Sequence, residues 1–202
     1  MNIAVFASGR GTNLSAIIRA QKTGKLNVNI SLMITDNPKA PAISKAKRAG
    51  VKTVVIKRKD FADKTGFERE IIKNLKAANI DLIVLAGFMR ILGPDLINGF
   101  HNKIINIHPA LLPSFKGAHA IADAFDYGVK ITGVTVHFVD SQIDCGPIIL
   151  QKEIEIKETE TPQSLEKKIH KTEHKIYPEA INLILQGRVK IEGRKVKITS
   201  LS

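Results

Sequence analysis

Apolar runs alternate with helical patterns through the first half of the chain. Short, nearly continuous apolar segments predict buried strands at 2–8, 29–35, 52–57, 81–87 and 103–108. Segments with apolar residues at helical spacing lie between them, at 14–21, 40–50, 67–79 and 94–101. Continuous apolar strands separated by helices indicate a parallel sheet that is covered on both faces. Such sheets bind ligands at the carboxyl ends of their strands.

The second half has a different pattern. A helix is predicted at 120–128, and two longer strands at 132–140 and 147–156 suggest an antiparallel addition. Thr161 and Pro162 are typical of an N-cap and a first helical position, and they open a long helix that runs towards Gly187 with a bend at Pro178. Residues 189–199 resemble a hairpin. The whole pattern predicts an α/β fold with a mostly parallel, Rossmann-like doubly wound sheet and an antiparallel C-terminal addition.

Composition places the chain among soluble globular proteins. Of its 202 residues, 44% are hydrophobic and 25% charged, which is ordinary for a folded domain. No apolar run approaches the roughly 20 residues that span a bilayer. The N-terminus has the pattern of a first strand and lacks that of a signal peptide. Because Cys145 is the single cysteine, no disulfide can staple the fold, and we expect a reducing, cytoplasmic setting.

The formal net charge of +12 favours anionic partners in general. The basic residues are scattered along the chain, aromatic residues make up 5%, and there is no Trp. Stacking platforms for single-stranded nucleic acid are therefore scarce. We expect a solvated basic surface and small anionic ligands, with no nucleic-acid partner and no membrane.

The segment SGRGTNL directly follows the first predicted strand. Gly9 and Gly11 allow close backbone approach, and the amides at the following helix N-terminus suit a phosphate. Thr12 or Asn13 could cap that helix or bind the anion. A phosphate monoester site is the first interpretation, and a plain tight turn without a ligand is the alternative.

A dinucleotide site is a third interpretation of the same loop. Asp36, at the end of the second predicted strand, could accept a hydrogen bond from a ribose hydroxyl. The third glycine of that fingerprint should fall at position 14, which is Leu14.

The segment AGFMRIL follows the fourth predicted strand. Gly87 lies where the strand leaves the sheet, and Met89 to Leu92 could wall an apolar slot with exposed backbone groups. The segment alone favours a simpler interpretation, a connection to the next helix that packs its own core.

The segment NIHPALLP follows the fifth predicted strand and has the strongest chemical pattern. Asn106 and His108 are two residues apart, so in a strand both side chains project to the same face. The Asn106 amide can donate to a developing oxyanion, and the His108 imidazole titrates near neutrality. Pro109 and Pro113 stiffen the exit from the strand. The alternative is a structural histidine at a strand end.

A partner carboxylate could come from VDSQIDCGP, where Asp140 and Asp144 flank a short loop. A carboxylate beside His108 would stabilise the imidazolium and raise its pKa. The alternative is that both are ordinary surface carboxylates, and their distance from His108 in the fold decides between the two interpretations.

His170, Glu173 and His174 spell H-x-x-E-H, a pattern of inverted zinc proteases. We expect no metal, because the short remainder of the chain offers few candidates for a further ligand. Ile169 and Ile176 predict that Glu173 lies on the inward face of the helix, where a buried carboxylate needs a partner.

The chain resembles the phosphoribosylglycinamide (glycinamide ribonucleotide) formyltransferases over nearly its whole length. The resemblance rests on ASGRGTNL, LAGFMRIL, NIHPALLPSFKGAHA, TGVTVHFVD, DCGPIILQ and TEHKIYPEA, in that order. A methionyl-tRNA formyltransferase should have a further C-terminal domain, and a formyltetrahydrofolate hydrolase an N-terminal regulatory domain. We therefore expect a small-nucleotide acceptor and a single formyltransferase domain over 1–202, with a nucleotide-binding half at about 1–100 and a folate and catalytic half at about 101–202.

This resemblance implies specific site residues. The ribonucleotide site would comprise Gly11, Thr12, Asn13, Gly87, His170, Lys171, Thr172 and Glu173. The site for the co-substrate 10-formyltetrahydrofolate would comprise Lys64, Met89, Arg90, Ile91, Leu92, Asn106, Asp140, Ser141, Gln142, Ile143 and Asp144. The family usually has Arg at the position of Lys64 and Gly at that of Cys145. Lysine keeps the charge but lacks the bidentate fork of arginine.

The catalytic residues implied are Asn106, His108 and Asp144. Asn106 and protonated His108 would donate to the oxyanion of a tetrahedral intermediate, while Asp144 keeps His108 charged and oriented. No metal or redox cofactor is expected, and the protein would be a monomer or a homodimer.

Overall fold

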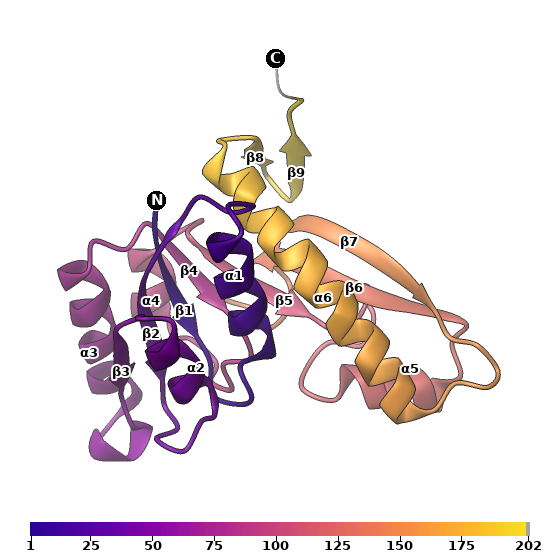
Figure 1. Ribbon diagram of the computed structural model, residues 1–202, viewed down its shortest axis with the longest axis horizontal. Helices are drawn as coiled ribbons and strands as arrows, with labels where there is room; N and C mark the ends of the chain where they lie inside the picture. The colour runs from indigo at the N-terminus through magenta and orange to yellow at the C-terminus, as the bar shows by residue number, and fades with distance from the viewer. Residues whose placement is uncertain (201–202) are drawn as a thin grey trace. The chain divides into compact units, whose positions relative to one another are not determined.

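The computed structural model describes residues 1–200 (Figure 1). Strands and helices follow one another along the chain in the predicted order. The strands are β1 (Asn2–Phe6), β2 (Asn29–Thr35), β3 (Thr53–Val55), β4 (Leu82–Leu85), β5 (Ile104–His108), β6 (Ile131–Phe138), β7 (Ile148–Glu155), β8 (Val189–Glu192) and β9 (Lys195–Ile198). The α-helices are α1 (Thr12–Lys22), α2 (Ala42–Arg48), α3 (Lys64–Ala77), α4 (Pro94–Gly99), α5 (Ala120–Tyr127) and α6 (Pro162–Leu185), and a 3-10 turn, η1, spans Arg58–Asp60.

The strands form a mostly parallel seven-stranded sheet in the order β3-β2-β1-β4-β5-β6-β7, and β8 and β9 form a separate hairpin. β1 pairs in parallel with both β2 and β4, and β2 pairs in parallel with β3. β6 and β7 pair antiparallel. The predicted fold class, a doubly wound sheet with an antiparallel C-terminal addition, is confirmed.

The chain divides into two compact units, unit 1 over Met1–Ile105 and unit 2 from Asn106 onward. The boundary falls inside β5, directly before Asn106. The single formyltransferase domain expected from the sequence remains a prediction.

In unit 1, the strand order determines where the helices lie. The chain moves from β1 to β2 to β3 in one direction along the sheet, and from β3 to β4 in the other. Because parallel crossovers are right-handed, α1 and α2 cover one face while α3 and α4 cover the opposite face. The contacts agree, since α1 packs against α2 and α3 packs against α4. Strands covered on both faces explain why β1 and β4 are buried along nearly their whole length.

In unit 2, α6 packs against both strands of the β6–β7 pair. The helix begins as predicted, with Thr161 as N-cap and Pro162 in the first turn, and Thr161 and Ser164 form a reciprocal capping box. Pro178 does not interrupt the helix, which continues to Leu185. The fully buried Tyr177 contributes to the apolar core of this unit.

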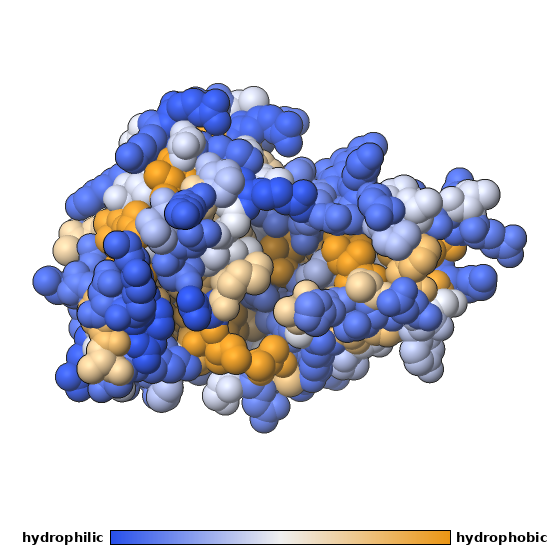
Figure 2. All heavy atoms as spheres, turned by 90° about the horizontal axis from the view of Figure 1, so that it is seen from below, coloured by the Kyte–Doolittle hydropathy of each residue, from blue (hydrophilic) through white to orange (hydrophobic). Residues whose placement is uncertain are grey.

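On the face shown in Figure 2, hydrophilic side chains cover much of the surface and apolar side chains gather in patches between them. No helix within residues 1–200 is both long and apolar enough to cross a membrane.

Candidate active site

The glycine loop between β1 and α1 depends on Gly11. Gly11 is the N-cap of α1 and has a left-handed φ of 67°, and a Cβ there would lie 2.7 Å from the Cβ of Ala42. The prediction that Thr12 or Asn13 caps this helix is wrong, because both already belong to the helix and no side chain caps it. The N–H groups of a first helical turn have no acceptor within the helix, so they suit an anion.

Asp36 is committed to other side chains of unit 1. Its Oδ1 accepts a hydrogen bond from Ser8 Oγ at 2.6 Å, and its Oδ2 accepts one from Arg90 Nε at 2.6 Å. The carboxylate is nearly buried. Each oxygen thus has a partner within the unit and little of the side chain is exposed, which argues against Asp36 as a ribose acceptor and against the dinucleotide interpretation.

The segment after β4 presents backbone and apolar groups. Gly87 has a φ of 80°, and its carbonyl accepts a hydrogen bond from the Ser8 N–H at 2.9 Å. Met89 and Ile91 are 71% and 65% exposed, whereas Leu92 is buried. The interpretation as a connection that packs its own core holds for Ala86, for Leu92 and for Phe88, whose ring packs against Phe6, but not for Met89 and Ile91. Asp36 uses only the Nε–H of Arg90, so the backbone of this segment, the exposed Met89 and Ile91 side chains and the rest of the half-exposed guanidinium remain for a ligand.

Lys64 is the first residue of α3, which Asp63 caps by accepting a hydrogen bond from the Gly66 N–H at 2.7 Å. The Lys64 Nζ lies 3.9 Å from Glu68 Oε1. Glu68 is buried and also accepts a hydrogen bond from the Gly93 N–H at 2.5 Å. Lys64 is thus half-exposed and paired with an anchored carboxylate.

The structure brings His108, at the end of β5, together with Asp144 in unit 2. His108 Nδ1 lies 3.3 Å from Asp144 Oδ2. On the other side of the ring, Nε2 lies 2.7 Å from the carbonyl oxygen of Phe115. Carboxylates and carbonyls only accept, so a ring with a proton on each nitrogen satisfies both partners.

His137 in β6 also belongs to this cluster, and sequence reasoning missed it. Its side chain is buried, and its Nδ1 donates to the carbonyl of Phe138 at 2.7 Å. Its Nε2 lies 3.3 Å from Asn106 Nδ2 and 3.6 Å from Asp144 Oδ1. Because Phe138 O requires the proton on Nδ1, Nε2 accepts a hydrogen bond from the Asn106 amide when the ring is neutral, and carries a proton that can face Asp144 Oδ1 when the ring is charged. In its neutral form, His137 therefore orients Asn106 and leaves the second amide N–H of Asn106 for a ligand.

A signal for His137 was present in the segment TGVTVHFVD. Thr135 and His137 are polar residues two apart in a mostly apolar strand, so they project to the same face. Thr135 is buried, donates to Ala110 O at 2.7 Å and accepts from the Leu112 N–H at 3.1 Å. Thr135 and His137 thus both contact β5 or the segment that follows it.

Asp144 is held in a polar, half-buried position. Its Oδ2 accepts a hydrogen bond from the Gly117 N–H at 2.9 Å. Burial raises the pKa of Asp144, but the contacts with His137 and Gly117 and the charges of His108 and His137 outweigh it, so the pKa lies below its ordinary 3.8. The carboxylate is therefore ionised at neutral pH. The backbone of Asp144 has a left-handed φ of 51°, which is uncommon for a residue with a Cβ.

The rest of the loop before Asp144 is open. Asp140 Oδ1 accepts a hydrogen bond from the Gln142 N–H at 2.9 Å, within the loop itself. Ser141, Gln142 and Ile143 are exposed. Of the two candidate carboxylates, only Asp144 reaches His108.

Glu173 lies on the inward face of α6 as predicted and is 4% exposed. Its Oε2 lies 2.9 Å from Nδ1 of His170, whose Nε2 lies 3.1 Å from Glu166. The hydrogen bond with Glu173 raises the pKa of His170 and, with the charges of both carboxylates, outweighs the lowering by burial. Lys171 is exposed, and the Thr172 hydroxyl donates to a backbone carbonyl one turn earlier at 3.1 Å. The described part of the chain contains no group of three His, Cys, Asp or Glu side chains that could hold a metal ion.

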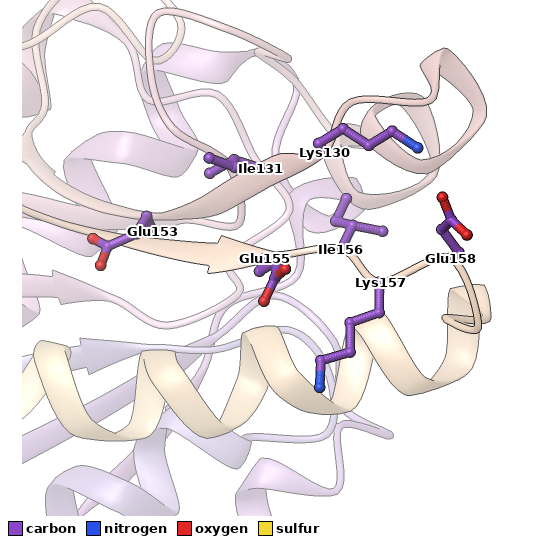
Figure 3. A pocket seen from close by; sticks show the side chains of 7 residues that line it. All are labelled: Lys130, Ile131, Glu153, Glu155, Ile156, Lys157 and Glu158. Atoms are coloured by element: carbon purple, nitrogen blue, oxygen red, sulfur yellow. The ribbon is translucent and has the colours of Figure 1, made fainter.

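A pocket of about 600 Å³ lies in unit 2 where β6 begins and β7 ends (Figure 3). It is lined by Lys130, Ile131, Glu153, Glu155, Ile156, Lys157 and Glu158. None of these residues was predicted to bind a ligand, and the pocket contains no member of the His108–Asp144 cluster.

Comparison with known proteins gives consistent matches. Residues 1–181 match the family model described as "Formyl transferase". Phosphoribosylglycinamide formyltransferase of Bacillus subtilis is 44% identical over 182 residues, which cover 90% of this chain and 93% of that protein. The human trifunctional purine biosynthetic protein adenosine-3 is 39% identical over 97% of this chain, which spans 19% of that longer protein. The crystal structure of glycinamide ribonucleotide transformylase 1 from Symbiobacterium toebii matches with a TM-score of 0.97 at 40% identity, over 99% of this chain and 94% of that one.

Proposed function

This chain belongs to the formyl transferase family, and we propose that it transfers the formyl group of 10-formyltetrahydrofolate to the amine of glycinamide ribonucleotide. The products are formylglycinamide ribonucleotide and tetrahydrofolate, a step of purine biosynthesis. The cluster of Asn106, His108, His137 and Asp144 is the observation that carries the proposal. It combines an oriented amide donor with an imidazole paired to an ionised carboxylate.

The cluster fits the charges that formyl transfer develops. As the substrate amine bonds to the formyl carbon, the formyl oxygen becomes an oxyanion, and the N–H of Asn106 not bonded to His137 would donate to it. In this structure the Nε2 proton of His108 points to Phe115 O. During the reaction His108 would give this proton to the folate nitrogen as the bond between that nitrogen and the formyl carbon breaks. Asp144 would retain the Nδ1 proton and stabilise the charged ring. The proton lost by the attacking amine passes to water.

The acceptor would be recognised by two sets of residues. The backbone amides of Gly11, Thr12 and Asn13 would hold the ribonucleotide phosphate, since Gly11 leaves them at a helix N-terminus. The Glu173 carboxylate would accept from the ribose hydroxyls, with His170, Lys171 and Thr172 beside it. Gly87 would contact the glycinamide group.

The formyl-folate would be bound mainly by backbone and apolar surface. Exposed Met89 and Ile91 offer apolar contact, as does Ile143 in the 140–144 loop. Arg90 would contribute through its backbone and through the guanidinium N–H groups that Asp36 does not use. Lys64 would meet the folate tail with a single charge that Glu68 partly balances. We propose that the enzyme uses no metal, acts in the cytoplasm as a monomer or homodimer, and has only small-molecule substrates.

One assay tests the proposal. The protein is mixed with 10-formyltetrahydrofolate, with and without glycinamide ribonucleotide, while absorbance follows folate release and the formyl group is traced. We expect transfer only when the ribonucleotide is present. Formate release without it would indicate a hydrolase and overturn the proposal.

Two variants connect the activity with the cluster. We expect Asn106→Ala to lose about 10²–10³ in turnover, the usual cost of one oxyanion donor, and His108→Ala to lose more because it also removes the proton donor. Exposed His101 is the matched control, and His101→Ala should keep parental turnover. Near-normal turnover of His108→Ala would refute the assigned site.

A further inference from the structure

We propose that Arg194, at the tip of the β8–β9 hairpin, is a positioning residue that holds the backbone of Cys145 and thereby keeps Asp144 aimed at His108. The inference rests on the proposed function, because it gives Arg194 an effect on turnover only through Asp144. Arg194 lies fifty positions from Asp144 in sequence and outside every segment that carries the family resemblance.

The geometry of the β8–β9 hairpin places Arg194 in its turn. β8 and β9 pair directly from Glu192 to Lys195, so Gly193 and Arg194 form a two-residue turn, and the φ of 60° at Gly193 suits a type II′ turn. At the open end, Arg188 Nε donates to Thr199 O at 2.6 Å. β9 also packs against β7. The turn is therefore fixed at its base and along one strand.

From that turn, Arg194 Nη1 donates to the carbonyl oxygen of Cys145 at 2.5 Å. Lys116 Nζ approaches the same residue from another loop, at 2.8 Å from the Cys145 Sγ. Cys145 thus has one partner for its backbone and another for its side chain. Both partners are cations from segments remote in sequence.

The residues on either side of Cys145 show why its position matters. Asp144 has a left-handed φ of 51°, a conformation that costs free energy for a residue with a Cβ and persists only when the surroundings impose it. At Gly146, a Cβ would lie 1.8 Å from Phe138 O, so the backbone there is in close contact with β6. Between these two positions, the bond from Arg194 fixes the orientation of the Cys145 carbonyl.

The loop is therefore divided into two parts. Residues 144–146 are held by Gly117, Lys116, Arg194 and β6. Residues 141–143 are exposed. We infer that the held part keeps the carboxylate in place while the exposed part remains free to meet the folate.

The test measures kcat and KM for formyl transfer in Arg194→Ala, Arg194→Lys and Lys195→Ala. Loss of one hydrogen bond should lower kcat of Arg194→Ala by about three- to tenfold. Arg194→Lys retains a cationic donor and should recover most of that loss. Lys195 is an exposed neighbour of like charge, and Lys195→Ala should match the parent. Parental kcat in Arg194→Ala would overturn the inference.

A double variant separates positioning from a general structural role. In an Asp144→Asn background, Arg194→Ala should cause no further loss of the residual turnover, because its target is already absent. The same loss in both backgrounds would show that Arg194 acts by another route and would also overturn the inference. If Asp144→Asn alone keeps parental turnover, the catalytic role assigned to Asp144 fails, which is a separate result from a failure of Arg194. Thermal unfolding of each variant confirms that the compared proteins are folded.

Discussion

Replacing His137 tests whether the orientation of Asn106 limits the reaction. His137→Phe keeps a ring of similar size at a position that is 2% exposed, but removes both ring nitrogens. Asn106 Nδ2 then loses its acceptor at 3.3 Å, and Phe138 O loses its donor at 2.7 Å. The substitution leaves the amide of Asn106 present but no longer held.

Two magnitudes follow from these lost bonds. An unpaired buried carbonyl costs about 1–3 kcal/mol of unfolding free energy. For a chain of this size that corresponds to a fall in Tm of roughly 2–12 °C. For catalysis, removing an oxyanion donor costs about 10²–10³, and an unoriented donor should cost less, so we expect kcat/KM to fall about 10- to 100-fold.

The assay is steady-state formyl transfer at a temperature where circular dichroism shows each variant to be folded. His137→Gln offers an amide oxygen to Asn106 and should lose less activity than His137→Phe. His101→Phe, the same substitution at an exposed histidine, serves as control. A folded His137→Phe variant with parental kcat/KM would refute the reasoning, because it would show that Asn106 needs no help from His137.

Three further predictions concern pH, the glycine loop and Glu173. Because the pKa of Asp144 is lowered in the folded state, the carboxylate stabilises the fold above pH 3.8, and this stabilisation is lost as pH falls through the lowered value. The free energy of unfolding, measured in urea, should therefore fall less steeply with decreasing pH in Asp144→Asn than in the parent, and an equal fall would contradict this. Gly11→Ala forces a Cβ against Ala42 at a left-handed φ and should cost about 1–3 kcal/mol in urea unfolding and raise the KM for the ribonucleotide, whereas unchanged values would show that the loop adjusts. Glu173→Gln should return the pKa of His170 towards 6.5 in an NMR titration. The raised pKa of His170 stabilises the folded protein below pH 6.5, and this stabilisation is lost as pH rises through the pKa of the folded state. The variant should therefore lose less stability than the parent between neutral and alkaline pH.

Much of the fold could be predicted from local patterns. The strand at 29–35 matches β2 at both ends, and the Thr161–Pro162 start of α6 was read from capping chemistry alone. These succeed because strand burial and helix capping depend on residues close together in the chain. The N-cap of α1 was missed, since the need for a left-handed φ at Gly11 arises partly from its contact with Ala42, thirty-one positions away.

The candidate site divides in the same way. The sequence by itself determined the chemical types, an amide and an imidazole two residues apart on β5 and a buried carboxylate on α6, because strand and helix periodicity set which side chains share a face. The tertiary structure alone decided their partners. It selected Asp144 over Asp140, bound Asp36 to Ser8 and Arg90, and added His137 to Asn106. Hydrogen bonds form over about 3 Å, and only folding brings residues 106, 108, 137 and 144 within that range.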